Sequence, residues 1–503
     1  MRQHDARRWV LIAGVLGSSM AFIDATAVNV ILPVLQNDLR ATVAEVQWVI
    51  EAYQLFLAAL ILLGGALGDR FGRRRVFAAG VFIFAVASAA CGFAPSAVFL
   101  IGARAIQGIG GALLTPGSLA LITGAYEDTE RGAAIGSWSA FSALTSAAGP
   151  VLGGWLAQHL SWRAIFFLNA PIAAAVLAIC LLRVKDSRPA QKPGLDPGGA
   201  LLATLGLGGI TYGLIESPQR GFADAAVAGS LVAGAIASLA FIVVESRARA
   251  PMLPLDIFRS RAFAGANLLT LFLYGALGGF FFFLPFDLIQ LRGYSPTQAG
   301  AALLPFAALL FAGSRSAGAL AVRIGARKPL TLGPALAAAG LVVMALSPSG
   351  GSYWTSTLPG LLLLGIGMTT TIAPLTTTVM SSCPQARAGL ASGVNNAVAR
   401  GASLLAIAVI GAAAIASFSA RFEEGLAKLP LAPQVRSELL AQRSRLAALE
   451  IPRSVSAHLR KSIESTVASS FRDSFRLALL LAASLALASA LVGLLTIRVK
   501  GRR

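Results

Sequence analysis

The chain has 503 residues, of which 56% are apolar and only 13% are charged, and its formal net charge is +19. A soluble protein would carry about 25% charged residues, and a disordered chain would be poor in apolar residues. The composition therefore excludes a disordered chain and argues against a set of soluble domains. The basic residues cluster at the ends of apolar runs, which is typical of membrane topology, so no nucleic-acid partner is expected.

The apolar residues form runs separated by Gly, Pro or charged clusters. Each run is long enough to cross the hydrocarbon core of a bilayer, about 30 Å, as a helix. We therefore predict an all-α integral membrane protein with fourteen transmembrane helices. In chain order they are expected at residues 9–34, 47–68, 76–94, 98–123, 133–157, 164–183, 199–216, 224–245, 263–290, 297–322, 328–347, 354–382, 389–417 and 474–497.

Two further segments carry predictions about their surroundings. Residues 418–472 are mostly polar with helical patterning, and we expect an amphipathic helix that lies on the membrane surface or over the bundle. The aromatic run Phe280–Phe283 could line a drug pocket, but at least half of it is expected to face lipid.

The distribution of Lys and Arg predicts the orientation. With a cytoplasmic N-terminus, the cytoplasmic segments hold 24 of them and the short outer loops hold four. The positive-inside rule then places both termini in the cytoplasm, in a multi-pass protein of the cytoplasmic membrane. Ten more lie on the outer side, between residues 418 and 476, in a connection whose length weakens the rule.

An internal repeat indicates how the helices are grouped. The segment Gly65–Arg75 follows the second helix, and Gly318–Lys328, which matches it at Gly, Leu, Arg and basic positions, follows the tenth. Repeats with a binding site between them are the usual plan of secondary transporters. We expect two six-helix lobes around a central cavity, at residues 1–183 and 262–503, with two linker helices within 184–261.

The first repeat, with Gly65, Asp69, Arg70 and Gly72, resembles the signature loop of the major facilitator superfamily. Further motifs resemble those of its 14-helix drug:proton antiporter family, a group of multidrug efflux transporters. They are Asp24–Pro33 in the first helix, Arg104–Gly111 in the fourth, Gly149–Gly154 in the fifth, and the pairs Trp162-Arg163 and Asn169 to Pro171. This chain departs from the family pattern at Glu51, Thr145 and Val322.

Asp24 and Arg104 are the candidates for proton coupling. A carboxylate in the middle of a membrane helix is costly and marks a functional site by default. Asp24 lies roughly 15 Å below the outer end of its helix and Arg104 roughly 10 Å below the end of the fourth, so the two side chains can meet in the central cavity. A change in their separation would load or release a proton, which is the use that the resemblance implies. The alternative is a static ion pair that locks two helices together.

The loop at 65–75 is a candidate gate. Gly68 and Gly72 permit a tight turn, and Asp69 could accept hydrogen bonds from the start of the thirteenth helix near Gly389. The gating residues are expected to be Gly65, Gly68, Asp69, Arg70, Gly72, Arg73 and Arg74. The alternative is that the arginines only set the topology.

In the fifth helix, Pro150 removes a backbone hydrogen bond, and Gly149, Gly153 and Gly154 let neighbouring helices approach closely. The resemblance implies an antiporter motif, and plain helix packing is compatible with it.

Polar residues inside apolar runs are candidates for the substrate cavity, although each could instead form a hydrogen bond between helices. They are Asn29, Tyr53, Gln54, Gln107, Arg315, Asn395, Asn396 and Arg400. Glu51 and Asp287 lie near outer helix ends, where we expect solvent to reach them.

The sequence thus predicts a proton-coupled antiporter that exports amphipathic drugs, toxins or natural products by alternating access. Its expected partners are protons, a small amphipathic substrate and the lipid bilayer, and it is expected to be a monomer. It is not expected to be an enzyme or to hold a cofactor or a metal, because no P-loop lysine and no cluster of metal-ligand residues is apparent. A proton-coupled importer of a small metabolite or a membrane sensor is the alternative.

Overall fold

A computed structural model of the chain describes residues 3–188, 194–248, 250–348, 351–384 and 387–497. Throughout these residues the regular secondary structure is helical. This confirms the predicted all-α fold class.

The N-terminal lobe begins with two long helices and contains one interrupted helix. Leu168 separates two short helices where the sequence predicts a single span at 164–183. The elements of this lobe are α1 (Gln3–Asp38), α2 (Val43–Phe71), α3 (Arg73–Gly92), α4 (Ala97–Ala125), α5 (Asp128–His159), α6 (Arg163–Phe167) and α7 (Asn169–Leu182).

Two linker helices, α8 (Pro197–Arg220) and α9 (Ala225–Arg247), and a 3-10 turn, η1 (Leu255–Arg259), lead to the second lobe. In that lobe, the tenth predicted helix is divided into α11 and α12. Its elements are α10 (Arg261–Phe286), η2 (Asp287–Leu291), α11 (Pro296–Ala301), α12 (Leu304–Ile324), α13 (Arg327–Leu346), α14 (Tyr353–Ser356), α15 (Leu358–Ser381), α16 (Ala388–Ala427), α17 (Pro433–Ala441), η4 (Arg443–Ala448) and α18 (Ala457–Thr496).

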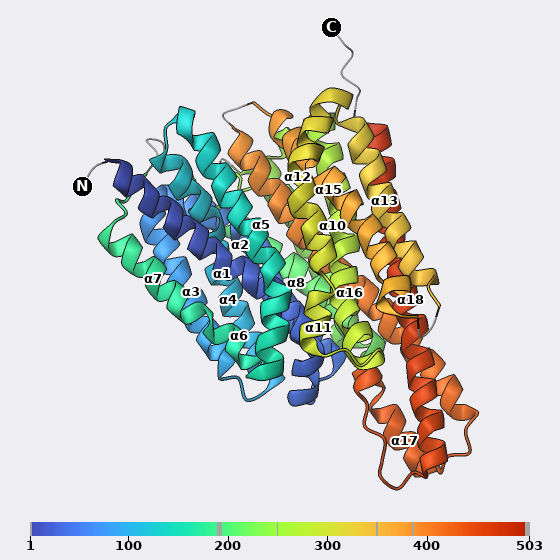
Figure 1. The fold of residues 1–503 in the computed structure, drawn as a ribbon. Coiled ribbons are helices and arrows are strands. Elements are labelled where there is room, and N and C mark those ends of the chain that lie inside the picture. Colours follow the sequence, from blue (N-terminus) through green and yellow to red (C-terminus); the bar gives the residue numbers. More distant parts are fainter. Residues whose placement is uncertain (1–2, 189–193, 249, 349–350, 385–386, 498–503) are drawn as a thin grey trace.

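Among the described residues, thirteen helices are long and apolar enough to span a membrane. The predicted span that is not among these thirteen is 133–157, which corresponds to α5, a helix of 32 residues that lies among the others in the bundle (Figure 1). Its Ser, Thr, Gly and Pro residues lower its apolar content, and its second half packs closely against α1 and α11. The helix count therefore agrees with the sequence prediction.

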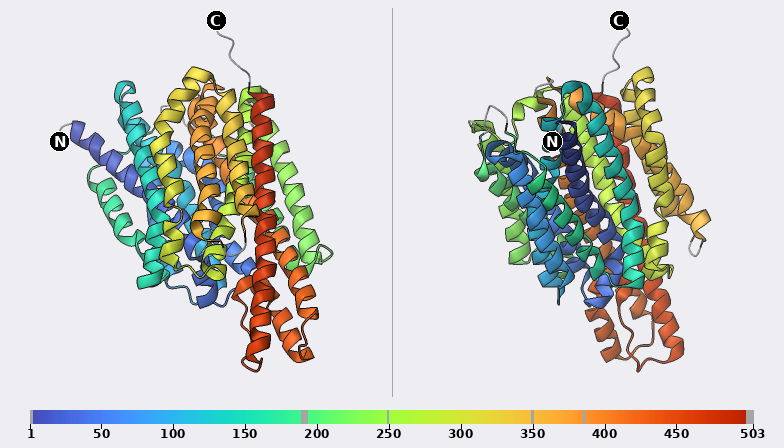
Figure 2. Two further views of the ribbon diagram at one scale, coloured as in Figure 1. Left: turned by 45° about the vertical axis from the view of Figure 1, so that its right-hand side comes forward. Right: turned by 60° about the vertical axis from the view of Figure 1, so that its left-hand side comes forward.

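The two lobes make close contacts at the end of the bundle opposite the termini (Figures 1 and 2). An added Cβ at Gly154 of α5 would lie 3.0 Å from the Cα of Thr297 in α11. Gln36 of α1 accepts a hydrogen bond from Gln290 of η2 at 2.8 Å, and Gln47 of α2 donates to the carbonyl of Ile407 in α16 at 3.2 Å. This end of the interface is therefore closed.

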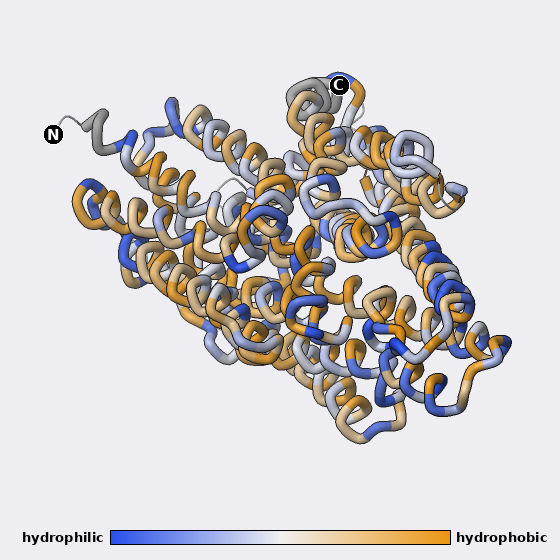
Figure 3. Tube along the Cα trace, turned by 60° about the horizontal axis from the view of Figure 1, so that its bottom comes forward, coloured by the Kyte–Doolittle hydropathy of each residue, from blue (hydrophilic) through white to orange (hydrophobic). Residues whose placement is uncertain are grey.

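The polar segment 418–472 differs from the prediction. The adjoining helices extend through it, α16 to Ala427 and α18 from Ala457, and with α17 and η4 they form a hairpin that projects from the bundle (Figure 1). Hydrophilic residues gather on this projection, whereas the bundle is mainly hydrophobic (Figure 3). Within this hairpin, η4 contacts the bundle, where Arg445 O accepts a hydrogen bond from Gln36 at 3.1 Å. Continuing two existing helices keeps their backbone hydrogen bonds, which a separate surface helix would interrupt.

The expectation that the aromatic run mostly faces lipid is wrong. Phe280, Phe282 and Phe283 are at most 2% exposed, and Phe281 packs edge-on against Phe306 of α12. The run is buried because α10 lies inside the second lobe, in contact with α16 and α18.

Close packing of α3 against α4 depends on glycine. A Cβ added at Gly110 would lie 2.6 Å from the backbone nitrogen of Phe84, whereas one at Gly102 would meet nothing within 4 Å. We expect Gly110→Val to lower the stability by about 1–3 kcal/mol or more through overpacking. Gly102→Val is a control on the same helix and should leave the apparent melting temperature in detergent nearly unchanged. Equal losses in both variants would contradict this account of the packing.

Candidate functional site

The first group of candidates forms one hydrogen-bonded cluster between α1 and α4. Arg104 Nη1 donates to Asp24 Oδ2 at 2.5 Å and to Gln107 Oε1 at 2.7 Å. Gln107 Nε2 donates to Asp24 Oδ1 at 2.9 Å. Arg104 and Gln107 share one face of α4 because residues three apart on a helix are neighbours. Both carboxylate oxygens of Asp24 are therefore paired.

A second set of contacts ties this cluster to α2. Arg104 Nε donates to the carbonyl of Val49 at 3.0 Å, and its guanidinium lies 4.4 Å from the centre of the Tyr53 ring. The side chains of Asp24 and Arg104 are 0% and 1% exposed. The pair thus meets as expected, but inside the N-terminal lobe and enclosed by α1, α2 and α4 rather than on an open cavity wall.

The arginines of the 65–75 loop bind the segment that follows α7. Arg74 N donates to Asp186 Oδ1 at 3.1 Å, and Arg75 Nε lies 3.2 Å from Asp186 Oδ2. Gly72 has a φ of +115°, and an added Cβ there would clash with both oxygens of this carboxylate, at 2.7 Å from Oδ1. A glycine is therefore required at position 72, both by the backbone conformation and by the carboxylate of Asp186.

In the described residues, Asp69 accepts a hydrogen bond from Arg73 at 2.7 Å rather than from the start of α16. Arg387, directly before α16, instead donates to Asp256 of η1 at 2.5 Å. This hydrogen bond from Arg387 holds the pKa of the Asp256 carboxyl below its usual range. The pair therefore stays charged at neutral pH, and it ties the start of α16 to the linker region.

The glycines of the fifth-helix motif face two partners. An added Cβ at Gly153 would lie 2.8 Å from the carbonyl oxygen of Ala27 in α1, and Gly149 faces the same helix. Gly154 faces α11 of the other lobe, and Gly300 of α11 in turn faces Pro150 and Val151, whose Cα would lie 3.1 Å from an added Cβ. The motif helix thus packs on its own lobe and on the opposite lobe through the same stretch of residues.

Asn29 lines an apolar pocket of about 220 Å³ between the lobes. Other walls come from Phe281 and Phe306 of the second lobe and from Pro150 of α5. The lining residues are Thr26, Asn29, Val30, Ala143, Ser146, Ala147, Pro150, Phe281, Leu284, Pro285, Leu303, Phe306, Ala307, Leu310 and Phe311.

The remaining cavity candidates lie in different surroundings. Asn395 donates to Thr270 at 2.7 Å and so joins α16 to α10, which is the helix–helix role weighed as its alternative. The Nε atom of Arg400 is buried without a hydrogen-bond partner among the described residues, and Tyr53 and Tyr274 are its electrostatic neighbours.

Two further candidates, Asn396 and Gln54, are not part of the Asp24 and Arg104 cluster. Asn396 is exposed and bonds to the backbone of its own helix. Gln54 is partly buried on α2. The side chain of Arg315 lies outside the described residues.

Comparison with known proteins decides the family. The model of the Major Facilitator Superfamily matches residues 14–418. The chain belongs to the Major Facilitator Superfamily.

Members of this superfamily that are named for drug or antibiotic resistance resemble the chain over most of its length. The tetracenomycin C resistance and export protein of Streptomyces glaucescens is 36% identical over 408 residues, which are 80% of this chain and 76% of that protein. The multidrug resistance protein Stp of Mycobacterium tuberculosis is 36% identical over 433 residues, which are 86% and 80% of the two chains.

Solved structures show the same superfamily fold. A bacterial homologue of the human lysosomal transporter Spinster, in an inward-facing and unoccupied conformation, matches with a TM-score of 0.66 at 18% identity over 99% of both chains. A D-xylose–proton symporter matches with a TM-score of 0.61 at 13% identity over 97% of this chain and 98% of its own.

Two acids of this superfamily member are more enclosed than the sequence suggests. Glu51 is 0% exposed and Asp287 is 3% exposed, so the expectation that solvent reaches them is wrong. Both oxygens of Glu51 lack a hydrogen-bond partner within the described part of the chain. Trp48 on the same face of α2 contacts Tyr212 of α8, so a linker helix covers the position that sequence reasoning treated as a helix end.

The effects of Asp24 and Arg104 on stability should depend on each other, and the removal of Arg104 tests this. Arg104→Gln leaves the Asp24 charge buried, and we expect a loss of about 3–5 kcal/mol in stability. Asp24→Asn combined with Arg104→Gln removes both charges and should lose less than the single Arg104 variant. Apparent melting temperatures in one detergent measure this. Arg220→Gln, which breaks an exposed pair with Glu216, is the control, and simple additivity of the two cluster substitutions would refute the coupling.

The two glycines of the signature loop should respond differently. Gly72→Ala should reduce folded protein and transport, because its φ is +115° and Asp186 occupies the Cβ position. Gly68→Ala should be tolerated, since its added Cβ meets only an atom 4.0 Å away. Yields of monodisperse protein and initial transport rates for both variants decide this, and equal tolerance would show that the Asp186 contact is dispensable.

Proposed function

We propose that the protein is a proton-coupled antiporter that exports amphipathic drugs, toxins or natural products by alternating access. The observation that carries the proposal is the 36% identity, over 80% of the chain, to a protein named for tetracenomycin C resistance and export. The 36% identity to a multidrug resistance protein over 86% of the chain supports it from a second relative.

The pocket between the lobes suits an amphipathic substrate. Its walls are mainly apolar, and Thr26, Asn29 and Ser146 supply the polar atoms. At about 220 Å³ it is smaller than a typical drug site of about 300–1,000 Å³. It would thus accommodate part of a substrate and enlarge when the lobes separate at the end opposite the termini.

Proton coupling would use the Asp24 and Arg104 pair. In this conformation Arg104 and Gln107 each donate a hydrogen bond to one oxygen of Asp24. Arg104 is also anchored to Val49 and Tyr53 of α2. A shift of α2 relative to α1 would draw Arg104 away and let Asp24 take up a proton, which links protonation to lobe movement.

The signature loop would act as the gate on the side that carries the termini. Here Asp69 is bonded to Arg73 within its own lobe, while Arg387 holds the start of α16 against η1. We infer that closure of this side brings Asp69 to the start of α16, and that the closed contacts at Gly154 and Gln36 then separate.

The topology proposed here has both termini in the cytoplasm, in the cytoplasmic membrane, and a single chain as the working unit. The lobes would comprise residues 1–183 and 262–503, with the linker helices in 184–261. The 24 Lys and Arg on the side of the termini, against four in the short opposite loops, support this orientation.

Uptake into energised inverted vesicles, in which export by the protein carries substrate into the lumen, tests the proposal. With a panel of amphipathic dyes, transport should require the pH gradient and stop when the gradient is collapsed. Asp24→Asn should abolish substrate-driven proton movement. Asp38→Asn is a matched control on the same helix, since Asp38 bonds to Trp162 and Arg163 near the helix end, and it should keep coupling. Transport that ignores the gradient would overturn proton coupling, and movement in the opposite direction would favour an importer.

A further inference from the structure

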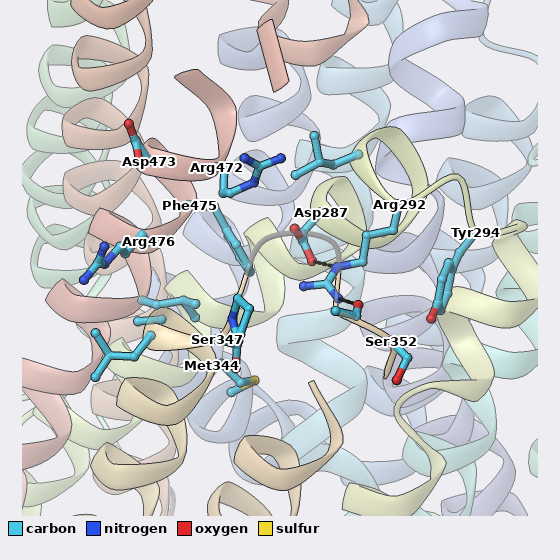
Figure 4. A pocket seen from close by; sticks show the side chains of 16 residues that line it. Asp287, Arg292, Tyr294, Met344, Ser347, Ser352, Arg472, Asp473, Phe475 and Arg476 are labelled. Atoms are coloured by element: carbon cyan, nitrogen blue, oxygen red, sulfur yellow. Dashed lines mark hydrogen bonds and ion pairs between the residues drawn. The ribbon is translucent and has the colours of Figure 1, made fainter. Parts of the chain in front are cut away.

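A charged pocket of about 380 Å³ lies in the second lobe, where α13 ends and η2 follows α10 (Figure 4). It is bounded by η2 and the residues after it, by the turn that follows α13, and by α18. The residues that matter here are Asp287, Arg292, Phe475, Arg472 and Arg476.

The acids at this pocket are already neutralised. Arg292 Nε donates to the buried Asp287 at 2.7 Å, and its Nη1 donates to Ser356 at 2.5 Å. Asp473 pairs with Arg421 of α16 at 2.8 Å. No carboxylate at the pocket is left to balance the other two arginines.

Arg472 and Arg476 lie one helical turn apart on α18. Neither forms a hydrogen bond or an ion pair of 4 Å or less with the described residues, and Arg472 acts on Asp287 only at longer range. Figure 4 shows Asp287 between Arg472 and Arg292, with Arg476 further along α18. Beside the ion pair of Arg292 with Asp287, the pocket therefore carries two guanidinium groups whose charge is not compensated. Such an arrangement attracts an anion.

The position of these arginines in the membrane indicates where the anion comes from. No charged residue follows Arg476 until Arg498, so the apolar part of α18 begins directly after the pocket. The apolar stretch of α10 ends just before Asp287, at the other side of the pocket. Since about 20 apolar residues span the hydrocarbon core, the arginines lie at the level of the lipid phosphates.

The walls of the pocket favour an amphiphile over a free ion. Met344, Leu346, Phe475 and Leu479 form an apolar side next to the arginines, and Leu346 is 59% exposed on the outside of α13. A phospholipid could place its phosphate on the guanidinium groups and its acyl chain along α13 and α18. Inorganic phosphate would leave this apolar surface uncovered.

We propose that this pocket binds the phosphate group of an anionic phospholipid, with Arg472 and Arg476 as its ligands. Guanidinium groups suit the site because their planar N–H pairs match phosphate oxygens. Bound lipid would brace α18 at the point where the hairpin leaves the membrane. This site is separate from the proposed export pathway, so it stands or falls independently of that function.

Native mass spectrometry of the full-length protein tests this site. Wild-type protein should bind phosphatidylglycerol in preference to phosphatidylcholine. Arg472→Gln with Arg476→Gln should weaken phosphatidylglycerol binding at least about tenfold, because two charge-assisted contacts are lost. The matched control is Arg453→Gln with Lys461→Gln, which removes two cations from the same hairpin outside the pocket and should leave binding unchanged.

Each alternative outcome overturns the assignment. Equal loss in the control variant would show diffuse charge attraction, and equal binding of the two lipids would exclude recognition of the anion. Displacement of the lipid by equimolar inorganic phosphate would show a site for a free ion. If the double variant does not elute as folded protein, the single variant Arg476→Gln tests the site instead. This side chain is exposed and has no bond to lose among the described residues, so the variant should fold. Its phosphatidylglycerol binding should still be weaker by about threefold or more.

Discussion

The buried ion pair between Asp24 and Arg104 constrains the N-terminal lobe more than any other interaction. Two charges withdrawn from water are tolerated only when their remaining donors and acceptors are satisfied. Gln107 and the carbonyl of Val49 complete the set, so α1, α2 and α4 must keep one register for the pair to exist. A relative movement of α1, α2 or α4 would therefore break contacts of this cluster.

Close backbone contacts impose the second constraint. Gly154 of α5 and Gly300 of α11 face each other's helices across the lobe interface, where no side chains intervene to deform. Such a contact is either fully formed or fully separated. A partial separation would leave a gap between the two helix backbones that neither side chains nor lipid could fill. The same reasoning explains why an apolar pocket lined by Asn29 and Phe306 persists beside this interface: the contact holds its two walls together.

The charge distribution at the end of the bundle opposite the termini differs from that of the short loops. Ten Lys and Arg between residues 418 and 476 run against the topology rule that the short loops follow. Some of them form local pairs, such as Arg421 with Asp473, and these need no further explanation. Arg472 and Arg476 have no such partner among the described residues, and they lie where the apolar part of α18 begins.

The sequence by itself determined the helical class, the number and order of the spans, and the meeting of Asp24 with Arg104. The helical class and the spans follow from local hydrophobicity, and the meeting of the pair follows from the similar depths of the two residues in their helices. Only the tertiary structure decided that this pair is enclosed within one lobe, that Glu51 is covered by a linker helix, and that Gly72 is fixed by Asp186. Burial and contact between residues far apart in the chain depend on which helix faces which, and neither hydropathy nor spacing encodes that choice.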